Sequence, residues 1–101
     1  MIVRIWHGRT HRSRSDEYAR FLRDRALPDY GSVSGIIKIQ VLRRNAGDVT
    51  HFLTVTHWES EEAIRSFAGS DILSAKYYPE DKDFLLEFEA EVQHYEVVAE
   101  D

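Results

Sequence analysis

Residues 54–69 read TVTHWESEEAIRSFAG, a stretch that predicts a strand, a turn and a helix in immediate succession. The alternating, β-branched residues that lead to Trp58 are typical of a strand. Ser60 can cap a helix, the two glutamates after it suit the positive end of a helix, and Gly69 can adopt the conformation that closes one. One face of this helix is apolar and carries Ile64, Phe67 and Ala68. The helix must therefore cover an apolar surface, which the strand before it supplies.

The composition is typical of one compact domain, residues 1–101, with 43% hydrophobic and 31% charged residues. A net charge of -5 argues against a nucleic-acid binder, which needs an excess of cations. The chain has no cysteine, which excludes disulfides, thiolate metal sites and a cysteine nucleophile. Neither a membrane span nor a secretory signal is evident. We therefore expect a soluble cytoplasmic protein with no nucleic-acid or membrane partner.

Short alternating runs predict four strands, at Ile2–His7, Gly35–Arg44, Val49–Trp58 and Phe88–Val98. Asn45–Asp48, between the middle two, has the composition of a hairpin turn. One face of the second strand is expected to carry Ile37, Ile39 and Val41. A first helix should begin at its candidate N-cap Ser15 and end at Pro28, which disfavours helical angles in the residue before it. Pro79 suits the start of a short helical turn before the last strand.

The order strand, helix, strand, strand, helix, strand is that of the ferredoxin-like βαββαβ fold, an α+β fold. It predicts a four-stranded antiparallel sheet with helices on one face. Apolar residues occur on both faces of the first strand, so both faces of the sheet should be covered. The face away from the helices would carry Trp6, Leu53 and Val55, or their neighbours in the alternation. A second copy of the chain is the simplest cover, which predicts a symmetric homodimer through this sheet face.

The five histidines form no metal-binding pattern, and we expect no metal site. His51 and His57 share a strand face but lie about 20 Å apart at roughly 3.3 Å per residue. His7 differs, because it ends the first strand just before Gly8 and is expected on the helix-covered face with Ile5. A histidine there can act as a base near neutral pH. The alternative is a capping histidine bonded to the loop backbone.

Trp58, Tyr77 and Tyr78 combine apolar rings with polar groups, which suits a flat aromatic ligand held by stacking and an oriented hydroxyl. Simple core packing is the alternative. The other expected substrate-binding residues are Ile5, Thr56, Phe67 and Tyr18. The acidic segment 80–83 is interpreted as the start of a short helix rather than a metal site. Phosphate loops, nucleophile elbows and nucleotide fingerprints do not occur.

Four groups of residues carry a family likeness: Phe52–Gly69, Ser70–Ile72 with Ala75, Tyr77–Asp81 and His94–Val97. In these groups the chain resembles the antibiotic biosynthesis monooxygenase family, whose members are small dimeric α+β barrel proteins. The resemblance spans nearly the whole chain. It implies a homodimer through the sheet face and a pocket between the sheet and the helices of each subunit.

The resemblance also implies a function, a cofactor-independent monooxygenase that acts on a small or polycyclic phenolic or quinol-type aromatic. His7 would be the base, Trp58 the stacking wall, and Tyr77 or Tyr78 the hydrogen-bond donor to the enolate oxygen. Haem-degrading members are similar at Trp58, but by position their first-strand asparagine falls on His7 and their haem-ligating histidine on Tyr77. The alternatives are a small-ligand-binding or stress-associated dimer without catalysis and a haem-binding or haem-degrading protein.

Overall fold

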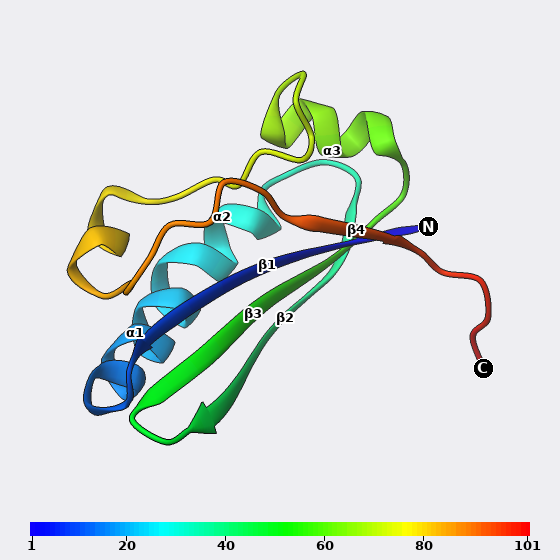
Figure 1. Cartoon of the computed structure of the whole chain (residues 1–101). Coiled ribbons are helices and arrows are strands. Elements are labelled where there is room, and N and C mark those ends of the chain that lie inside the picture. The colour runs from blue at the N-terminus through cyan, green and yellow to red at the C-terminus, as the bar shows by residue number, and fades with distance from the viewer.

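The computed structural model describes residues 1–101 as a twisted four-stranded sheet with helices packed on one face (Figure 1). The strands are β1 (Ile2–His11), β2 (Ile36–Ala46), β3 (Val49–Trp58) and β4 (Gln93–Glu96). The helical elements are η1 (Arg12–Arg14), α1 (Ser15–Phe21), η2 (Leu22–Ala26), α2 (Leu27–Gly31), α3 (Glu61–Ala68) and η3 (Pro79–Asp83). Every neighbouring pair in the order β2-β3-β1-β4 is antiparallel. The predicted ferredoxin-like α+β fold is confirmed.

The strand β3 and the helix after it lie where the sequence predicts them. β3 spans Val49–Trp58, and Gly47 at positive φ forms the hairpin with β2. The Ser60 hydroxyl oxygen accepts the Ala63 N–H at 3.2 Å, and Gly69 closes α3 at φ 91°. Ile64 is fully buried. This part of the chain therefore follows local rules of strand alternation and helix capping.

The register of β1 against β3 decides which side chains face the helices. Trp6 pairs with Thr54, and the Trp6 ring belongs to the main core together with residues of α1, η2 and α2. Ile5 and His7, one position away, therefore lie on the opposite face, which we call the open face. The expectation that His7 and Ile5 share the helix-covered face is wrong, as is the placement of Trp6 on the open face. Leu53 and Val55 lie on the open face as expected.

β1 is longer than predicted, because it continues through Gly8 to His11. A Cβ at Gly8 would lie 2.6 Å from the Trp6 ring, so the missing side chain lets the indole lie flat along the strand. The glycine thus gives room for a core side chain and does not end the strand.

The first helix also differs from its prediction. Ser15 is its first helical residue and makes no side-chain cap. Helical structure passes Pro28 and continues to Gly31, by way of the π-helical segment η2. Pro28 lies in the first turn of α2, directly after that π-helical segment. A proline is tolerated in a first turn, because its missing N–H is not needed there.

The strands β2 and β4 differ from their predictions because of how their backbones pair with neighbouring segments. In β2 a bulge between Ile36 and Lys38 turns Ile37 out to 52% exposure, so Ile36 replaces it beside Ile39 and Val41 on the core face. The predicted strand at Phe88–Val98 contains only β4. Before β4, the carbonyl of Ala90 accepts the Ala75 N–H and the Val92 N–H bonds to Leu73. The backbone of residues 90–92 is thus paired with the loop after α3 and not with β1.

No helix in the chain combines the length and the apolar character needed to cross a membrane.

Candidate functional site

Two small adjoining cavities lie between the sheet and the helical layer, and together we call them the interlayer pocket. The inner cavity, of about 10 Å³, is lined by Trp6, Tyr18, Leu22, Ala26, Tyr30, Thr54, Lys76, Tyr78 and Asp81. The outer cavity, of about 70 Å³, is lined by Asp29, Tyr30, Phe67, Lys76, Tyr77 and Tyr78. Tyr30, Lys76 and Tyr78 border both, so the two cavities form one region.

The indole of Trp6 supplies an unused hydrogen-bond donor in this region. Trp6 is 7% exposed and lines the inner cavity, yet its Nε1–H has no partner. A buried N–H without an acceptor is costly, and such groups are rare in native proteins. A ligand that offers an oxygen acceptor would satisfy it.

A buried carboxyl group, that of Asp81, also lines the inner cavity. Its Oδ1 accepts the Tyr18 hydroxyl at 2.8 Å and its Oδ2 accepts the Tyr78 backbone N–H at 2.7 Å. Burial raises the pKa of Asp81 despite these two hydrogen bonds. Burial, followed by the charge of Asp81, raises the pKa of Tyr18 well above its usual range. Asp81 can therefore take up a proton at a pH where an exposed aspartate would not.

The hydroxyls of Tyr77 and Tyr78 already donate hydrogen bonds within the protein. The Tyr77 hydroxyl donates to the Glu89 carbonyl at 2.6 Å and the Tyr78 hydroxyl to Asp29 Oδ2 at 2.6 Å. Burial and the bond to Asp29 raise the pKa of Tyr78, and burial raises the pKa of Tyr30 to about 12. All of these phenols stay protonated near neutral pH, so they can act as donors and not as bases.

Trp58 and Thr56 lie beneath the pocket and do not line it. Both are buried, and the Trp58 Nε1–H donates to Thr56 Oγ1 at 2.8 Å. The ring of Trp58 packs against Phe67, with 5.5 Å between the centroids. Of the predicted substrate-binding residues, Trp58 and Thr56 are therefore outside the lining of this pocket. Trp58 is the packing junction between β3 and α3.

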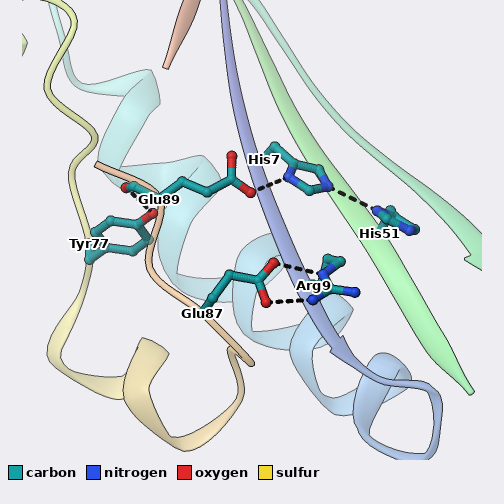
Figure 2. A network of polar contacts seen from close by, with 6 residues as sticks. All are labelled: His7, Arg9, His51, Tyr77, Glu87 and Glu89. Carbon is teal, nitrogen blue, oxygen red and sulfur yellow. Dashed lines mark hydrogen bonds and ion pairs between the residues drawn. The ribbon is translucent and has the colours of Figure 1, made fainter. Parts of the chain in front are cut away.

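His7 belongs to a polar network on the open face (Figure 2). Its Nδ1 lies 2.5 Å from Glu89 Oε2 and its Nε2 lies 2.9 Å from His51 Nδ1. Beside this triad, Arg9 forms a two-pronged ion pair with Glu87 at 2.6 and 2.8 Å. A cavity of about 340 Å³ on this face is lined by His7, Leu42, Arg43, Arg44, His51 and Leu53. The sheet thus separates His7 from the interlayer pocket.

Comparison with known proteins identifies the family. Residues 1–75 match the model of the antibiotic biosynthesis monooxygenase family. The chain belongs to this family. No curated protein sequence matches it.

Similar solved structures include members of this family. A candidate antibiotic biosynthesis monooxygenase from Bacillus cereus has 15% identity and a TM-score of 0.68, with 99% of this chain and 95% of that chain covered. The haem degrader MhuD from Mycobacterium tuberculosis, with two haems in its active site, has 24% identity and a TM-score of 0.67, with 100% and 99% covered. A variant of MhuD with two manganese protoporphyrin IX per active site has 21% identity and a TM-score of 0.64, with 100% and 98% covered. At these identities the similarity shows a shared fold.

Within this antibiotic biosynthesis monooxygenase fold, the structure gathers Tyr18, Phe67, Tyr77 and Tyr78 of the predicted site around the interlayer pocket. The other lining residues were not predicted from the sequence, among them Trp6, Tyr30, Lys76 and Asp81. From the sequence, Asp81 is predicted only as an acid at the start of a short helix. Its side chain does accept the backbone N–H of Tyr78, the residue that caps η3. No local signal marks Asp81 as buried, because the neighbouring acids Glu80 and Asp83 belong to the same helix-start pattern.

Proposed function

We propose that this member of the antibiotic biosynthesis monooxygenase family is an enzyme that binds a small phenolic or quinol-type aromatic in the interlayer pocket. The buried, unpaired Nε1–H of Trp6 carries the proposal, because Trp6 lines a cavity together with the aromatic rings of Tyr18, Tyr30 and Tyr78. A phenolic or enolic oxygen would accept that hydrogen bond while its ring packs against Tyr30 and Phe67.

The proposed reaction uses the electrons of the substrate. Asp81, with its raised pKa and its bond to Tyr18, is the group that receives the substrate proton, and Trp6 stabilises the resulting oxyanion. The deprotonated substrate then reduces O₂, so that a CH₂ group and O₂ become a carbonyl and water. All four electrons come from the substrate carbon. We therefore assign the base to Asp81, since His7 lies across the sheet from the pocket.

The pocket must widen before such a ligand fits. Ligand pockets are usually about 300–1,000 Å³, whereas the two cavities measure about 10 and 70 Å³. The loop between α3 and η3 carries Lys76, Tyr77 and Tyr78, so its displacement would enlarge both cavities together.

Oxygen uptake with a panel of hydroxylated aromatics tests the proposal. We expect turnover in the presence of a metal chelator and without flavin, and its loss in Asp81→Asn and Trp6→Phe. His7→Ala serves as the matched control and should retain turnover. No oxygen uptake across the panel, together with ligand-induced thermal stabilisation, would support instead a ligand-binding or stress-associated protein without catalysis.

We propose further that the open face pairs with a second copy to form a homodimer. Val55, Ile5 and Leu53 lie on it, together with the exposed Leu42 and Tyr95. Burial of such a surface is favourable, and a self-complementary patch suits two-fold symmetry. Light scattering at micromolar concentration should give the mass of two chains, and a monomeric mass would contradict the proposal.

Haem binding is the second candidate, because two of the similar structures contain haem or a manganese porphyrin. The small cavities and the hydrogen-bonded Tyr77 at the position predicted for a haem ligand argue against it. Titration with haemin, followed by its absorption spectrum, distinguishes haem binding from binding of a phenolic ligand. We expect the spectrum of free haemin to persist, and a shifted Soret band would favour haem over a phenolic ligand.

A further inference from the structure

Arg4 of β1 is a buried cation without a carboxylate partner. It is 4% exposed and lies under α3 and the loop that follows, with its guanidinium 5.9 Å from the centre of the Phe67 ring. Its Nη1 donates to the Ile72 carbonyl, its Nη2 to the Ser74 carbonyl at 3.0 Å, and its Nη1 also lies 3.1 Å from His94 Nε2. All three acceptors are neutral, so no carboxylate contacts the guanidinium of Arg4 directly.

This geometry fixes the protonation of His94. A guanidinium only donates, so Nε2 of His94 must hold a lone pair and Nδ1 must hold the proton. That Nδ1 is buried and has no partner. Burial, followed by the charge of Arg4, lowers the pKa of His94, while the carboxylate of Glu61 on α3 opposes them weakly. Glu61 is itself paired with Arg65 at 3.1 Å. A second proton on His94 would place two cations in direct contact.

The two carbonyls that Arg4 holds belong to residues 70–78, the loop that runs from α3 towards η3 (Figure 1). The same loop carries Lys76 and Tyr78, which line both cavities of the interlayer pocket. Backbone bonds of Leu73 and Ala75 to the segment before β4 and the Lys76 bond to the Phe67 carbonyl at 3.0 Å also hold this loop. At its far end, the Tyr77 hydroxyl donates to the Glu89 carbonyl and the Tyr78 hydroxyl to Asp29, so the Arg4 bonds secure the part of the loop around residues 72–74. Arg4 is thus a buried side-chain link between the sheet and the wall of the pocket.

We propose that Arg4 and His94 form a proton-operated catch that keeps residues 70–78 against the sheet while His94 is neutral and releases them when His94 is protonated. In the closed state Arg4 has three acceptors. In the protonated state it loses the imidazole and is repelled by it, so the carbonyls of Ile72 and Ser74 are freed. That release opens the interlayer pocket, a consequence that rests on the function proposed above.

The direction of the pH effect follows from linkage. The pKa of His94 is lowered in the closed state, so the closed state binds fewer protons than the open one. Closure is therefore stable above the ordinary histidine pKa of about 6.5 and weakens as the pH falls below it. Ligand entry should be easier at pH 5.5 than at pH 8.

Hydrogen exchange of residues 70–78 without any ligand tests the catch itself. After correction for intrinsic exchange, we expect protection to fall between pH 8 and pH 5.5 by up to about tenfold, the ratio of protonated to neutral imidazole at pH 5.5 for an open-state histidine with the ordinary pKa of about 6.5. In His94→Gln, whose amide oxygen can still accept from Arg4 but cannot titrate, protection should persist at both pH values. His57→Gln, on the open face, is the matched control and should behave as the wild type. The test uses a His94 variant because Arg4→Met would remove a buried side chain that holds two backbone carbonyls and could destabilise the whole fold.

Binding of 2-naphthol, which remains neutral over this pH range, separates the catch from the proposed function. If naphthol binds more tightly or faster at pH 5.5 than at pH 8, and this difference disappears in His94→Gln, both the catch and the proposed function are supported. A pH-dependent loop without any naphthol binding supports the catch and counts against the function. The catch is overturned if the protection of residues 70–78 does not change with pH, or if His94→Gln changes with pH as the wild type does.

Discussion

Removal of one hydroxyl, in Tyr18→Phe, should destabilise the chain in a pH-dependent way. Tyr18 is fully buried, and its hydroxyl is one of two donors to the buried carboxyl of Asp81. A hydrogen bond to a charged group contributes about 1.5–3 kcal/mol, and a bond to a neutral one about 1 kcal/mol. The variant leaves the ring and its packing in place, so the lost hydrogen bond dominates the change in free energy of unfolding.

The pH dependence comes from Asp81. Its pKa is raised in the folded state by burial, while the Tyr18 bond opposes that rise. A carboxyl group whose folded pKa lies above the unfolded value reduces stability as the pH rises through that interval. Loss of the Tyr18 bond raises the folded pKa further, so the variant should lose more stability at pH 8 than at pH 4. We expect a loss of about 1.5–3 kcal/mol at pH 8 and about 1 kcal/mol at pH 4.

Urea unfolding followed by circular dichroism at both pH values measures this difference, at one fixed protein concentration because association changes apparent stability. A fall in Tm of roughly 4–8 °C for each kcal/mol should accompany it. Tyr95→Phe is the control, since Tyr95 is 54% exposed. An equal loss at the two pH values, or none at either, would refute the assignment of Asp81 as a buried carboxylate that depends on Tyr18.

Three further perturbations have defined outcomes. Ser60→Ala should lower the free energy of unfolding by about 1 kcal/mol, because the cap of α3 is lost, and Ser70→Ala is the comparison. Gly8→Ala should cost about 1–3 kcal/mol in the same assay, since its Cβ would overlap the Trp6 ring; an unchanged midpoint would contradict the observed Trp6 position. His7→Ala should leave naphthol binding intact and weaken the dimer in sedimentation, because His7 lies on the open face with His51 and Glu89.

Local signals were sufficient where a few neighbouring residues decide the structure. The bounds of β3, the Ser60 cap and the Gly69 end of α3 all follow from short-range sterics and hydrogen bonding. Predictions failed where a distant partner intervenes. Helical structure continues past Pro28 because a π-helical segment precedes it, and β4 is short because the loop after α3 takes the backbone groups before it.

The candidate site shows the same division. Tyr77 and Tyr78 were found as a polar aromatic pair, and both line the pocket. Asp81, a few positions away, was missed because nothing local distinguishes a buried carboxyl group from a solvated one. Its burial depends on Tyr18 of α1 and on the core residues that line the inner cavity with it, which lie far away along the chain. Lys76 is exposed, and only the fold brings it to the pocket.

The sequence by itself determined the order and kind of the elements, the hairpin, the capped helix after Trp58 and membership of a ferredoxin-like class. It also determined which residues of β1 share a face, because side chains alternate along a strand. Only the tertiary structure decided which of those two faces meets the helices. Both faces of β1 carry apolar residues, and packing of the Trp6 ring over Gly8 among α1, η2 and α2 selects one of them. That choice places His7 with Glu89 and His51 on the open face and leaves Trp6 and Asp81 beside the interlayer pocket.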